Sequence, residues 1–462
     1  MSTSVQKLDE RLAVDLWRAL GASERHAAHL GFVGEEPALP GAFHVSSLAT
    51  ASIGVATLAA AELWAVRTGA ALRGIEVDRG HASAAFRLER FMKADGWTLP
   101  PIWDPIAGDY EACDGWVRLH TNYVLHRDAA TAALGVEANR EIVKSAVRAR
   151  SALDVEEAVV ARGGCAAALR SRAAWKRHPQ GEAVAAEALV ARSPDAGDAR
   201  AAAPARGSAE ARAPLAGLRV LDLTRVIAGP VCTRLLAAYG ADVLRLDPPG
   251  FEEVPLLLPE MTRGKRCAFV DLKTDEGRRT FDALLARADV LVHGYRRGAL
   301  EALGYSPERL QELKPRGVTI RMDAYGHTGP WAERRGFDSL VQMSTGIADP
   351  GNGGRPTPLP AQALDHATGY LMAAAACRAL VDGTRETRLS LARTAALLVE
   401  LGTRDDAGAS GPDDPTPFIE RVDTAWGRLD SVKVPGRIEG CAPVLPIPAG
   451  PLGRDAPAFE AV

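Results

Sequence analysis

The sequence predicts an α/β fold: an open parallel Rossmann-like sheet, accompanied by an additional helix-rich α+β region. From residue 218 onward, short apolar runs with β-branched residues alternate with stretches whose apolar residues recur at helical spacing. The connections between these segments are short, which is typical of parallel βαβ units in a doubly wound sheet. Before residue 193, Ala-rich helical patterns prevail, so a helical layer is expected there.

Five strands are expected in the sheet. They are LRVLDL from residue 218, ADVLRLD from 241, CAFVDL from 267, DVLVHGY from 289 and GVTIRMDAYG from 317. Helical patterns follow the first strand, ending at Gly240, and the third, over EGRRTFDALLARA. Ligands of such sheets bind beyond the carboxyl ends of the strands. The candidate binding loops are therefore RVIAGP, GYRRG and AYGHTGP, after the first, fourth and fifth strands.

Composition divides the chain into four parts. Residues 193–214 are poor in aliphatic residues and rich in Ala, Arg, Pro and Asp, which predicts a flexible linker. The linker separates a helix-rich α+β region, residues 1–192, from a Rossmann-like domain, residues 215–404. The segment 405–462 is rich in Pro and Gly and is expected to form an irregular C-terminal tail.

A faint internal repeat links the two halves. LATASIGVATLAAAELWAV from Leu48 and LDHATGYLMAAAACRALV from Leu364 align on Gly54 and Gly369, and an amphipathic stretch follows each. In this register Asp365 lies opposite Thr50. The alignment predicts the same supersecondary unit in both halves, and chance similarity of two Ala-rich helices is the alternative.

Charge and motif content exclude several classes of function. The formal net charge of −3 gives no reason to expect nucleic acid or an anionic membrane as a partner. The six cysteines are scattered singly, and no HExxH, GxSxG or phosphate-loop motif is present, so no metal site is expected. The most apolar stretch, from Leu48, is broken by Glu62 and is expected to be a buried helix. With no secretory signal at its start, the chain is expected to be cytoplasmic.

Asp365 is the most informative single residue. It directly precedes an apolar helical run, so it could be an N-cap that stabilises the helix by about 1 kcal/mol. A carboxylate in that position could also be reactive. The positive end of the helix dipole would keep it ionised, and the anion could attack an acyl thioester. Spacing alone does not decide between the two roles.

Several motifs in series resemble family III (CaiB/BaiF) CoA-transferases. PLAGLRVLDLTRVIAGPVCTRLLAAYGADVLRLDPPG is similar to the opening of that family. RGKRCAFVDLKTDEGR, HGYRRGALEALGYSPERLQELKP, AYGHTGPWAERRGFDSLVQMSTG and the Asp365 segment then follow in family order. The resemblance implies an enzyme of the EC 2.8.3 type that moves CoA from an acyl-CoA donor to a free carboxylic acid. It implies Asp365 as the nucleophile, coenzyme A as a substrate, no cofactor or metal, and a homodimer.

The same resemblance implies which residues contact CoA. They lie in the turn after the first strand, in the RGKR segment and in the turns after the fourth and fifth strands. These candidates are Arg225, Val226, Ala228, Arg263, Lys265, Tyr295, Arg296, Tyr325 and Gly326. The cationic ones suit phosphate oxygens.

The chain departs from the family pattern in two ways. GIEVDRGHASAAFRLERF, DYEACDGWVRLHTN and AWKRHPQGEAVA resemble segments near the C-terminus of family members but come first here, as in a permuted or fused-and-trimmed member. LPPIWDPIAG stands where many transferases have a glycine-rich loop that shields the intermediate, which puts efficient transfer in question.

Two alternatives therefore stay open. One is a CoA-binding family member that has lost catalysis. The other is a 2-methylacyl-CoA racemase, a class that shares the aspartate and adds a histidine base in a GHD-type motif. The matching motif here is GFDSL, in which Phe337 cannot accept a proton.

Overall fold

The structure is a computed structural model that describes residues 2–37, 39–193, 213–251, 253–314, 317–404 and 414–460. The predicted linker over 193–214 lies almost entirely outside the described residues. The statements below concern the described ranges.

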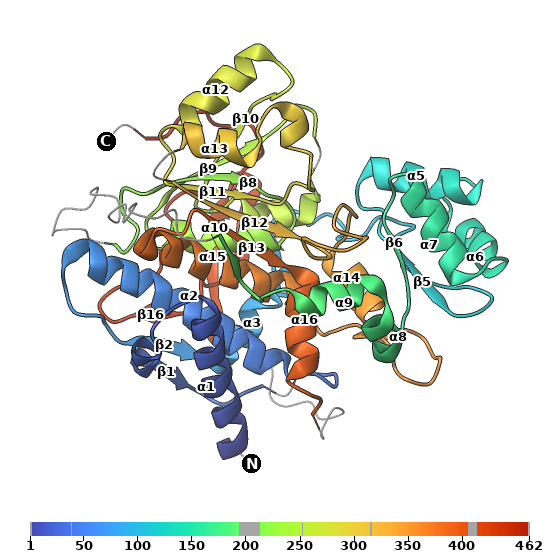
Figure 1. Ribbon diagram of the computed structural model, residues 1–462, viewed down its shortest axis with the longest axis horizontal. Coiled ribbons are helices and arrows are strands. Elements are labelled where there is room, and N and C mark those ends of the chain that lie inside the picture. Colours follow the sequence, from blue (N-terminus) through green and yellow to red (C-terminus); the bar gives the residue numbers. More distant parts are fainter. Residues whose placement is uncertain are drawn as a thin grey trace.

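A seven-stranded sheet forms the centre of the molecule (Figure 1). Its spatial order is β10 (Arg266–Phe269), β9 (Asp242–Asp247), β8 (Arg219–Leu223), β11 (Val290–His293), β12 (Val318–Asp323), β13 (Glu386–Ser390) and β7 (Ala191–Arg192). The first six strands are parallel, and β7 pairs antiparallel with β13. The five expected strands and the open Rossmann-like sheet are confirmed. The sequence analysis missed β13 and β7, because β13 is short and polar and β7 is a two-residue edge strand.

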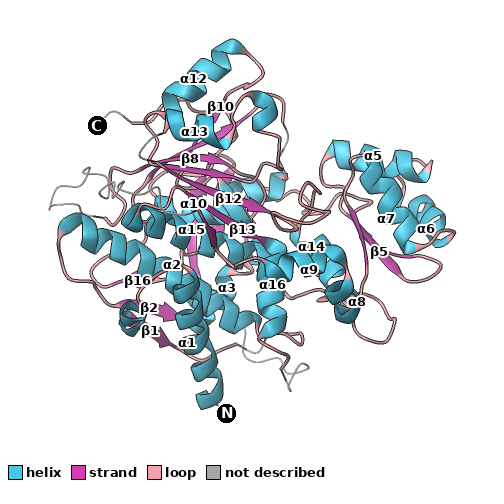
Figure 2. Cartoon of the chain, in the orientation of Figure 1, coloured by secondary structure: helices cyan, strands magenta, loops and turns pink. Residues whose placement is uncertain are grey.

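Helices cover both faces of this sheet (Figures 1 and 2). Alternation along the strands decides which residues face which layer. Val220 and Val243 belong to the core beneath α10 (Ala228–Ala238) and α15 (Ala363–Asp382). Their neighbours in sequence, such as Leu221, pack with α12 (Asp275–Leu285) and α13 (Pro307–Leu313) on the other face.

The first 85 residues join this core. Helix α2 (Val45–Thr68) packs against α15 and α1 (Ser2–Ala19) packs against α2, so these residues share one core with the central sheet. By length and composition α2 is the one helix among the described residues that could cross a membrane, but 89% of its apolar window is buried inside the protein. It is the buried helix that the sequence predicts.

The internal repeat is confirmed as a strand–helix–strand–helix unit. In the N-terminal copy the unit is β1 (Leu30–Val33), α2, β2 (Ile75–Asp78) and α3 (Arg79–Ala85). In the second copy it is β12, α15, β13 and α16 (Leu391–Glu400). Each copy pairs its two strands in parallel. Thr50, the counterpart of Asp365, is buried and bonds only back to the Ser46 carbonyl, so the first copy has no carboxylate at this position.

A lobe with its own small core stands beside the sheet (Figure 2). It contains the antiparallel strands β4 (Gly108–Glu111), β5 (Trp116–Leu119) and β6 (Ala166–Ala168). The helices of the lobe are α5 (Val124–Leu134), α6 (Arg140–Arg148) and α7 (Ala152–Ala161). Helices α8 (Arg172–Arg177), α9 (Pro179–Ala186) and α14 (Asp338–Thr345) lie between this lobe and the main body.

The expectation of an irregular tail is wrong for part of residues 405–462. Strands β14 (Ile419–Thr424) and β15 (Gly427–Val432) form a hairpin, to which β3 (Lys93–Asp95) adds a third strand. Gly427 has φ 128°, which lets the chain reverse tightly, and Leu429 is buried under the hairpin. Strand β16 (Arg437–Ile438) joins β2, and the remaining described tail has no other helix or strand. Shorter helical turns complete the fold at α4 (Leu88–Phe91), α11 (Leu258–Met261) and the 3₁₀ turns η1 (Glu24–His29), η2 (Pro255–Leu257), η3 (Glu301–Leu303) and η4 (Thr416–Phe418).

Candidate active site

A cavity of about 520 Å³ opens beyond the carboxyl ends of β8, β11 and β12. It gathers six of the residues that the sequence analysis singled out, from the turns after β8 and β11 and from the start of α15. They are Arg225, Val226, Ala228, Tyr295, Arg296 and Asp365. The position agrees with the general rule for open α/β sheets.

Asp365 is not the N-cap of its helix. Helix α15 begins at Ala363, and a different carboxylate caps it: Asp338, at the start of α14, accepts the backbone N–H groups of Leu364 at 2.8 Å and of Asp365 at 3.0 Å. Within the described residues no group donates a hydrogen bond to the Asp365 carboxylate, which lines the cavity and is only 7% exposed. The N-cap hypothesis for Asp365 is therefore wrong, and its carboxylate is left available for chemistry.

Burial raises the pKa of Asp365 well above that of an ordinary aspartate, and the nearby carboxylates of Asp338 and Glu89 raise it further. The expectation that the helix dipole keeps Asp365 ionised is thus wrong for the unliganded protein, because the N–H groups at the helix start donate to Asp338. Burial also raises the pKa of Asp338, to about 6, although those same N–H groups oppose the rise.

Replacing Asp338 by Asn is expected to shift the activity profile to lower pH. The amide keeps an acceptor oxygen for the helix N–H groups but removes the negative charge that disfavours ionisation of Asp365. The pKa of Asp365 falls, so the acid limb of kcat/KM should move down by about one pH unit. The matched control is Asp154→Asn on the exposed face of α7, which should leave the profile in place. An unchanged acid limb in Asp338→Asn would show that Asp365 does not titrate with Asp338.

The turn after β8 is held in a strained conformation. Val226 has φ 65°, the only positive φ of a non-glycine residue among those described, and this costs about 1–2 kcal/mol. Its N–H donates to Glu253 Oε2 at 3.2 Å. The neighbouring Arg225 guanidinium lies 3.4 Å above the Phe251 ring and 3.7 Å from Asp247 Oδ1. These contacts fix the Arg225 side chain at the cavity wall.

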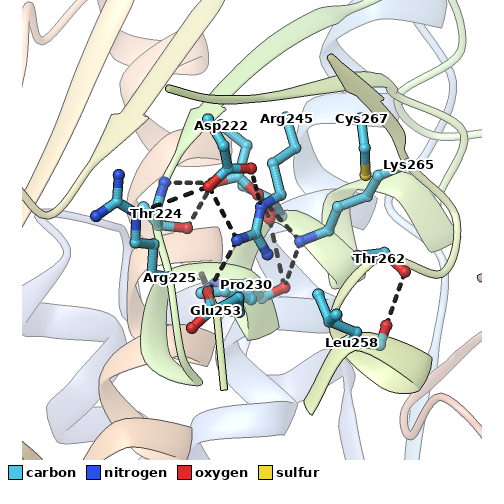
Figure 3. Close-up of polar contacts among 12 residues, drawn as sticks. Asp222, Thr224, Arg225, Pro230, Arg245, Glu253, Leu258, Thr262, Lys265 and Cys267 are labelled. Carbon is cyan, nitrogen blue, oxygen red and sulfur yellow. Dashed lines mark hydrogen bonds and ion pairs between the residues drawn. The ribbon is translucent and has the colours of Figure 1, made fainter. Parts of the chain in front are cut away.

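A buried ionic network supports this turn from beneath (Figure 3). Arg245 is fully buried and pairs with Asp247 and with Glu253, each at 2.8 Å. Glu253 also accepts a hydrogen bond from the Tyr123 hydroxyl at 2.7 Å. Burial would raise the pKa of Glu253, but Arg245 and Tyr123 outweigh it, so the pKa is lowered and Glu253 stays ionised. Through Tyr123 the network ties the lobe to the strained turn.

The RGKR segment does not reach the cavity. The Lys265 ammonium is fully buried and lies 3.0 Å from Asp222 Oδ2. Figure 3 shows the two side chains directed toward each other. Arg263 pairs with Glu420 at 2.8 Å and lines a different hollow, beside β15. Neither residue therefore lies at this cavity, and their contact with CoA phosphates stays a prediction. The reason is topological: both precede β10, at the amino edge of the parallel sheet, whereas the cavity lies at the carboxyl edge.

The loop after β12 contributes to the cavity, but through other residues than expected. Asp323 and Ala324 line the cavity, whereas Tyr325 and Gly326 do not. The Tyr325 hydroxyl bonds to Ser344 at 3.1 Å inside the core, and the Gly326 N–H donates to Asp323 at 2.7 Å. These two residues lie one or two positions beyond the cavity wall, and their contact with CoA stays a prediction.

Sequence reasoning missed several cavity residues. They come from the lobe and from the segment before α14, and they are Tyr123, His126, Arg334, Arg335 and Phe337. No local pattern marks Tyr123 and His126, because they lie more than 200 positions from Asp365. Phe337 was noted only as the residue that replaces a racemase histidine. Burial lowers the pKa of His126 to about 4, so its imidazole is neutral at physiological pH.

A second hollow of about 240 Å³ adjoins the main cavity. The two share Arg225, Phe251 and Tyr295 in their walls, and the hollow adds Lys273 and apolar side chains. No group of three or more potential metal ligands occurs within the described ranges. The site therefore offers one reactive carboxylate, cationic walls and an apolar side hollow.

Comparison with known proteins identifies a family to which part of the chain is similar. A sequence model described as CoA-transferase family III matches residues 215–398, which include α10, α15 and Asp365. These residues belong to CoA-transferase family III. The chain is 33% identical over 206 residues to a probable fatty acyl-CoA transferase, Rv3272, of Mycobacterium tuberculosis, covering 41% of this chain and 52% of that protein. It is 37% identical over 147 residues to the succinyl-CoA–L-malate CoA-transferase beta subunit of Chloroflexus aurantiacus, covering 29% and 36%.

Solved structures of family III proteins are similar over comparable lengths. A crystal structure of Rv3272 is 31% identical, with a TM-score of 0.37, over 41% of this chain and 56% of that one. A CAIB/BAIF family protein from Brucella suis is 26% identical, with a TM-score of 0.36, over 47% and 65%. The chain thus spans about half the length of the mycobacterial relative. The N-terminal segments fall outside the family III match, so their permuted order stays a prediction.

Proposed function

We propose that the protein transfers CoA from an acyl-CoA donor to a free carboxylic acid, with Asp365 as the nucleophile. The observation that carries the proposal is the buried Asp365 carboxylate. It accepts no hydrogen bond from the described residues, and it lines a cavity whose walls include Arg225 and Arg296. A CoA thioester needs both features: an anion to attack its carbonyl carbon and cations for its phosphates. Relatives named as succinyl-CoA–L-malate and formyl-CoA:oxalate CoA-transferases support the class of reaction.

The proposed reaction cycle needs no external energy source. An Asp365 oxygen bonds to the thioester carbonyl carbon, the C–S bond breaks, and a mixed anhydride and CoA thiolate result. The thiolate attacks the aspartyl carbonyl, releasing the donor acid as a carboxylate and leaving an aspartyl–CoA thioester. The acceptor carboxylate attacks that carbonyl and expels the thiolate, which then attacks the acceptor's acyl carbon. This last step frees the new acyl-CoA and regenerates the Asp365 carboxylate.

The two hollows suit the two ends of CoA. The main cavity contains Asp365 and therefore takes the thioester end. The adjoining hollow has mostly apolar walls with Lys273, Asp247 and Asp271, and it suits the adenine ring and ribose of the nucleotide. Arg225 and Tyr295 stand at the junction of the two hollows, where the pyrophosphate would pass.

A transfer assay tests the proposed function. The full chain is incubated with a panel of acyl-CoAs and short-chain or dicarboxylic acids, and new acyl-CoA is separated by chromatography. Formation of acceptor acyl-CoA by the wild type, and its loss in Asp365→Asn, supports the proposal. CoA binding without any turnover would favour a family member that has lost catalysis. Exchange of the α-hydrogen in D₂O without transfer would favour the racemase alternative.

Replacing Arg225 by Met is expected to weaken CoA binding about tenfold, because one charge-assisted hydrogen bond to a phosphate is lost. Met keeps the length of the side chain and its contact with Phe251, so the melting temperature should change little. Isothermal titration with CoA measures the effect. Arg428→Met on the exposed face of β15 is the matched control and should bind CoA like the wild type. Equal CoA affinities of the two variants would show that Arg225 does not contact CoA.

We further propose a homodimer, as the resemblance to the family implies. Light scattering behind a sizing column gives the mass directly. A monomer at working concentration would contradict this part of the proposal.

A further inference from the structure

A separate cavity of about 190 Å³ lies on the opposite face of the sheet from Asp365. Thr319 and Arg321 of β12 point away from α15, since the alternating Val318 and Ile320 pack into the core on the α15 side. His293, at the end of β11, lines the same cavity, and α13 and the residue after it, Lys314, close the cavity. The proposed CoA-transfer chemistry uses none of these side chains.

The cavity has a marked excess of positive charge. Four cationic side chains line it, and only Glu301 and Glu386 oppose them; the cations are Arg296, Lys314, Arg321 and Arg385. Lys314 is 3% exposed, and its ammonium bonds to the neutral Thr319 hydroxyl at 3.2 Å instead of to a carboxylate. Burial, reinforced by Arg385, lowers the pKa of Lys314 to about 7. Glu386 and Asp289 oppose this shift only in part, so this buried ammonium, which donates to a hydroxyl and not to a carboxylate, gains from an anionic partner.

Two further groups in the cavity wall have polar atoms without partners. Within the described part of the chain, the buried Nε of Arg321 has no hydrogen-bond acceptor. His293 is more than nine-tenths buried, and its Nδ1 has no hydrogen-bond partner among the described residues. Burial and the nearby Arg321 and Lys314 charges lower the pKa of His293 to about 3, so the neutral ring has one N–H to donate. Buried donors are almost always satisfied in folded proteins, so these groups point to a ligand.

We propose that this cavity binds a small oxyanion of inorganic phosphate size, held by Lys314, Arg321 and His293. The excess of two positive charges among the lining residues matches a divalent oxyanion, and the three donors come from three different elements. The volume corresponds to about six waters at roughly 30 Å³ each, enough for one phosphate with residual water.

The site adjoins the candidate active site without being part of it. Tyr295 and Arg296 line both cavities, whereas His293 belongs to the oxyanion cavity and Gly294 to the main one. The turn after β11 therefore separates the two ligands. A phosphate bound on one side contacts the same turn that faces CoA on the other.

The test is titration of the full chain, without CoA, with inorganic phosphate at constant ionic strength. Binding is measured by calorimetry and by the rise in melting temperature. Lys314→Met and, as a second variant, Arg321→Gln should each weaken phosphate binding about tenfold, since each removes a charge-assisted hydrogen bond. Arg225→Met, which alters only the CoA side, should bind phosphate like the wild type.

Three results would overturn the proposal. One is a wild type that binds phosphate no better than it binds chloride. Another is phosphate binding that is unaltered in both Lys314→Met and Arg321→Gln. The third is loss of binding in Arg225→Met alone, which would place the phosphate in the CoA cavity. The assay requires no transfer activity, so its outcome is independent of the proposed function.

Discussion

Replacement of Asp365 by Asn is expected to lower the rate of CoA transfer by at least about a thousandfold, because an amide cannot form the aspartyl anhydride or thioester. The side chain keeps its size and lines the same cavity, so CoA binding should persist. Initial rates with saturating donor and acceptor measure the loss of activity, and titration with CoA measures the binding. Transfer at wild-type rates in this variant would exclude Asp365 as the nucleophile.

The same substitution is expected to stabilise the fold at neutral and alkaline pH, by about 1–3 kcal/mol. The pKa of Asp365 is raised in the folded state, chiefly by burial, so the folded protein binds its proton more tightly than the unfolded chain does. Stability therefore falls as pH rises from the unfolded pKa through the folded one, and the neutral amide of the variant would carry no such penalty. Urea unfolding of both proteins at pH 5 and pH 8 tests this sign. The stability advantage of Asp365→Asn should be larger at pH 8, and an advantage confined to pH 5 would contradict the assignment.

Replacement of Lys265 by Met is expected to lower the free energy of unfolding by about 3–5 kcal/mol. The substitution leaves the Asp222 carboxylate buried beneath the sheet without its ammonium partner (Figure 3). Burial alone would raise the pKa of Asp222, but in the native protein Lys265, with Arg245 and the Thr224 and Thr233 hydroxyls, outweighs it and the pKa is lowered. Chemical denaturation measures the loss of stability. The control, Lys144→Met on the exposed face of α6, should change stability by less than about 0.5 kcal/mol.

A double variant separates an ion-pair role from a ligand role for Lys265. Asp222→Asn in the Lys265→Met background removes the orphaned charge and should recover part of the lost stability. If Lys265→Met were instead fully stable but bound CoA weakly, Lys265 would be the phosphate ligand that the family resemblance implied.

The central fold was predictable because strands and helices repeat their apolar residues with different periods along the sequence. Alternating apolar residues, such as Val220 and Leu221, face opposite helical layers, and this pattern marks the five strands. Strand β13 escaped prediction because its stability comes from its partner β12 and not from its own apolar content. The hairpin of the tail likewise depends on pairing with residues 93–95, far away in the sequence.

The site was predictable only for residues that lie in turns at the strand ends or that match a family motif. The turns after β8 and β11 reach the cavity because parallel strands end at one edge, and the resemblance to the family selected Asp365 among the carboxylates. Asp338 could not be recognised as the true cap, since it lies 27 residues before Asp365 and reaches the helix through tertiary packing. The charge of Lys265 suits a phosphate, but its position at the amino edge of the sheet directs its side chain to Asp222, which sequence alone does not reveal.

The most direct test of the account is chemical trapping of the proposed intermediate. The full chain is incubated with each acyl-CoA of a panel, treated with hydroxylamine and digested, and the peptide that contains Asp365 is examined by mass spectrometry. Hydroxylamine attacks an aspartyl anhydride or thioester at its carbonyl and leaves a hydroxamate on the aspartate. The account predicts a hydroxamate at Asp365 with at least one donor and none in Asp365→Asn. Transfer activity accompanied by an unmodified Asp365 peptide, or by a hydroxamate on another carboxylate, would contradict it.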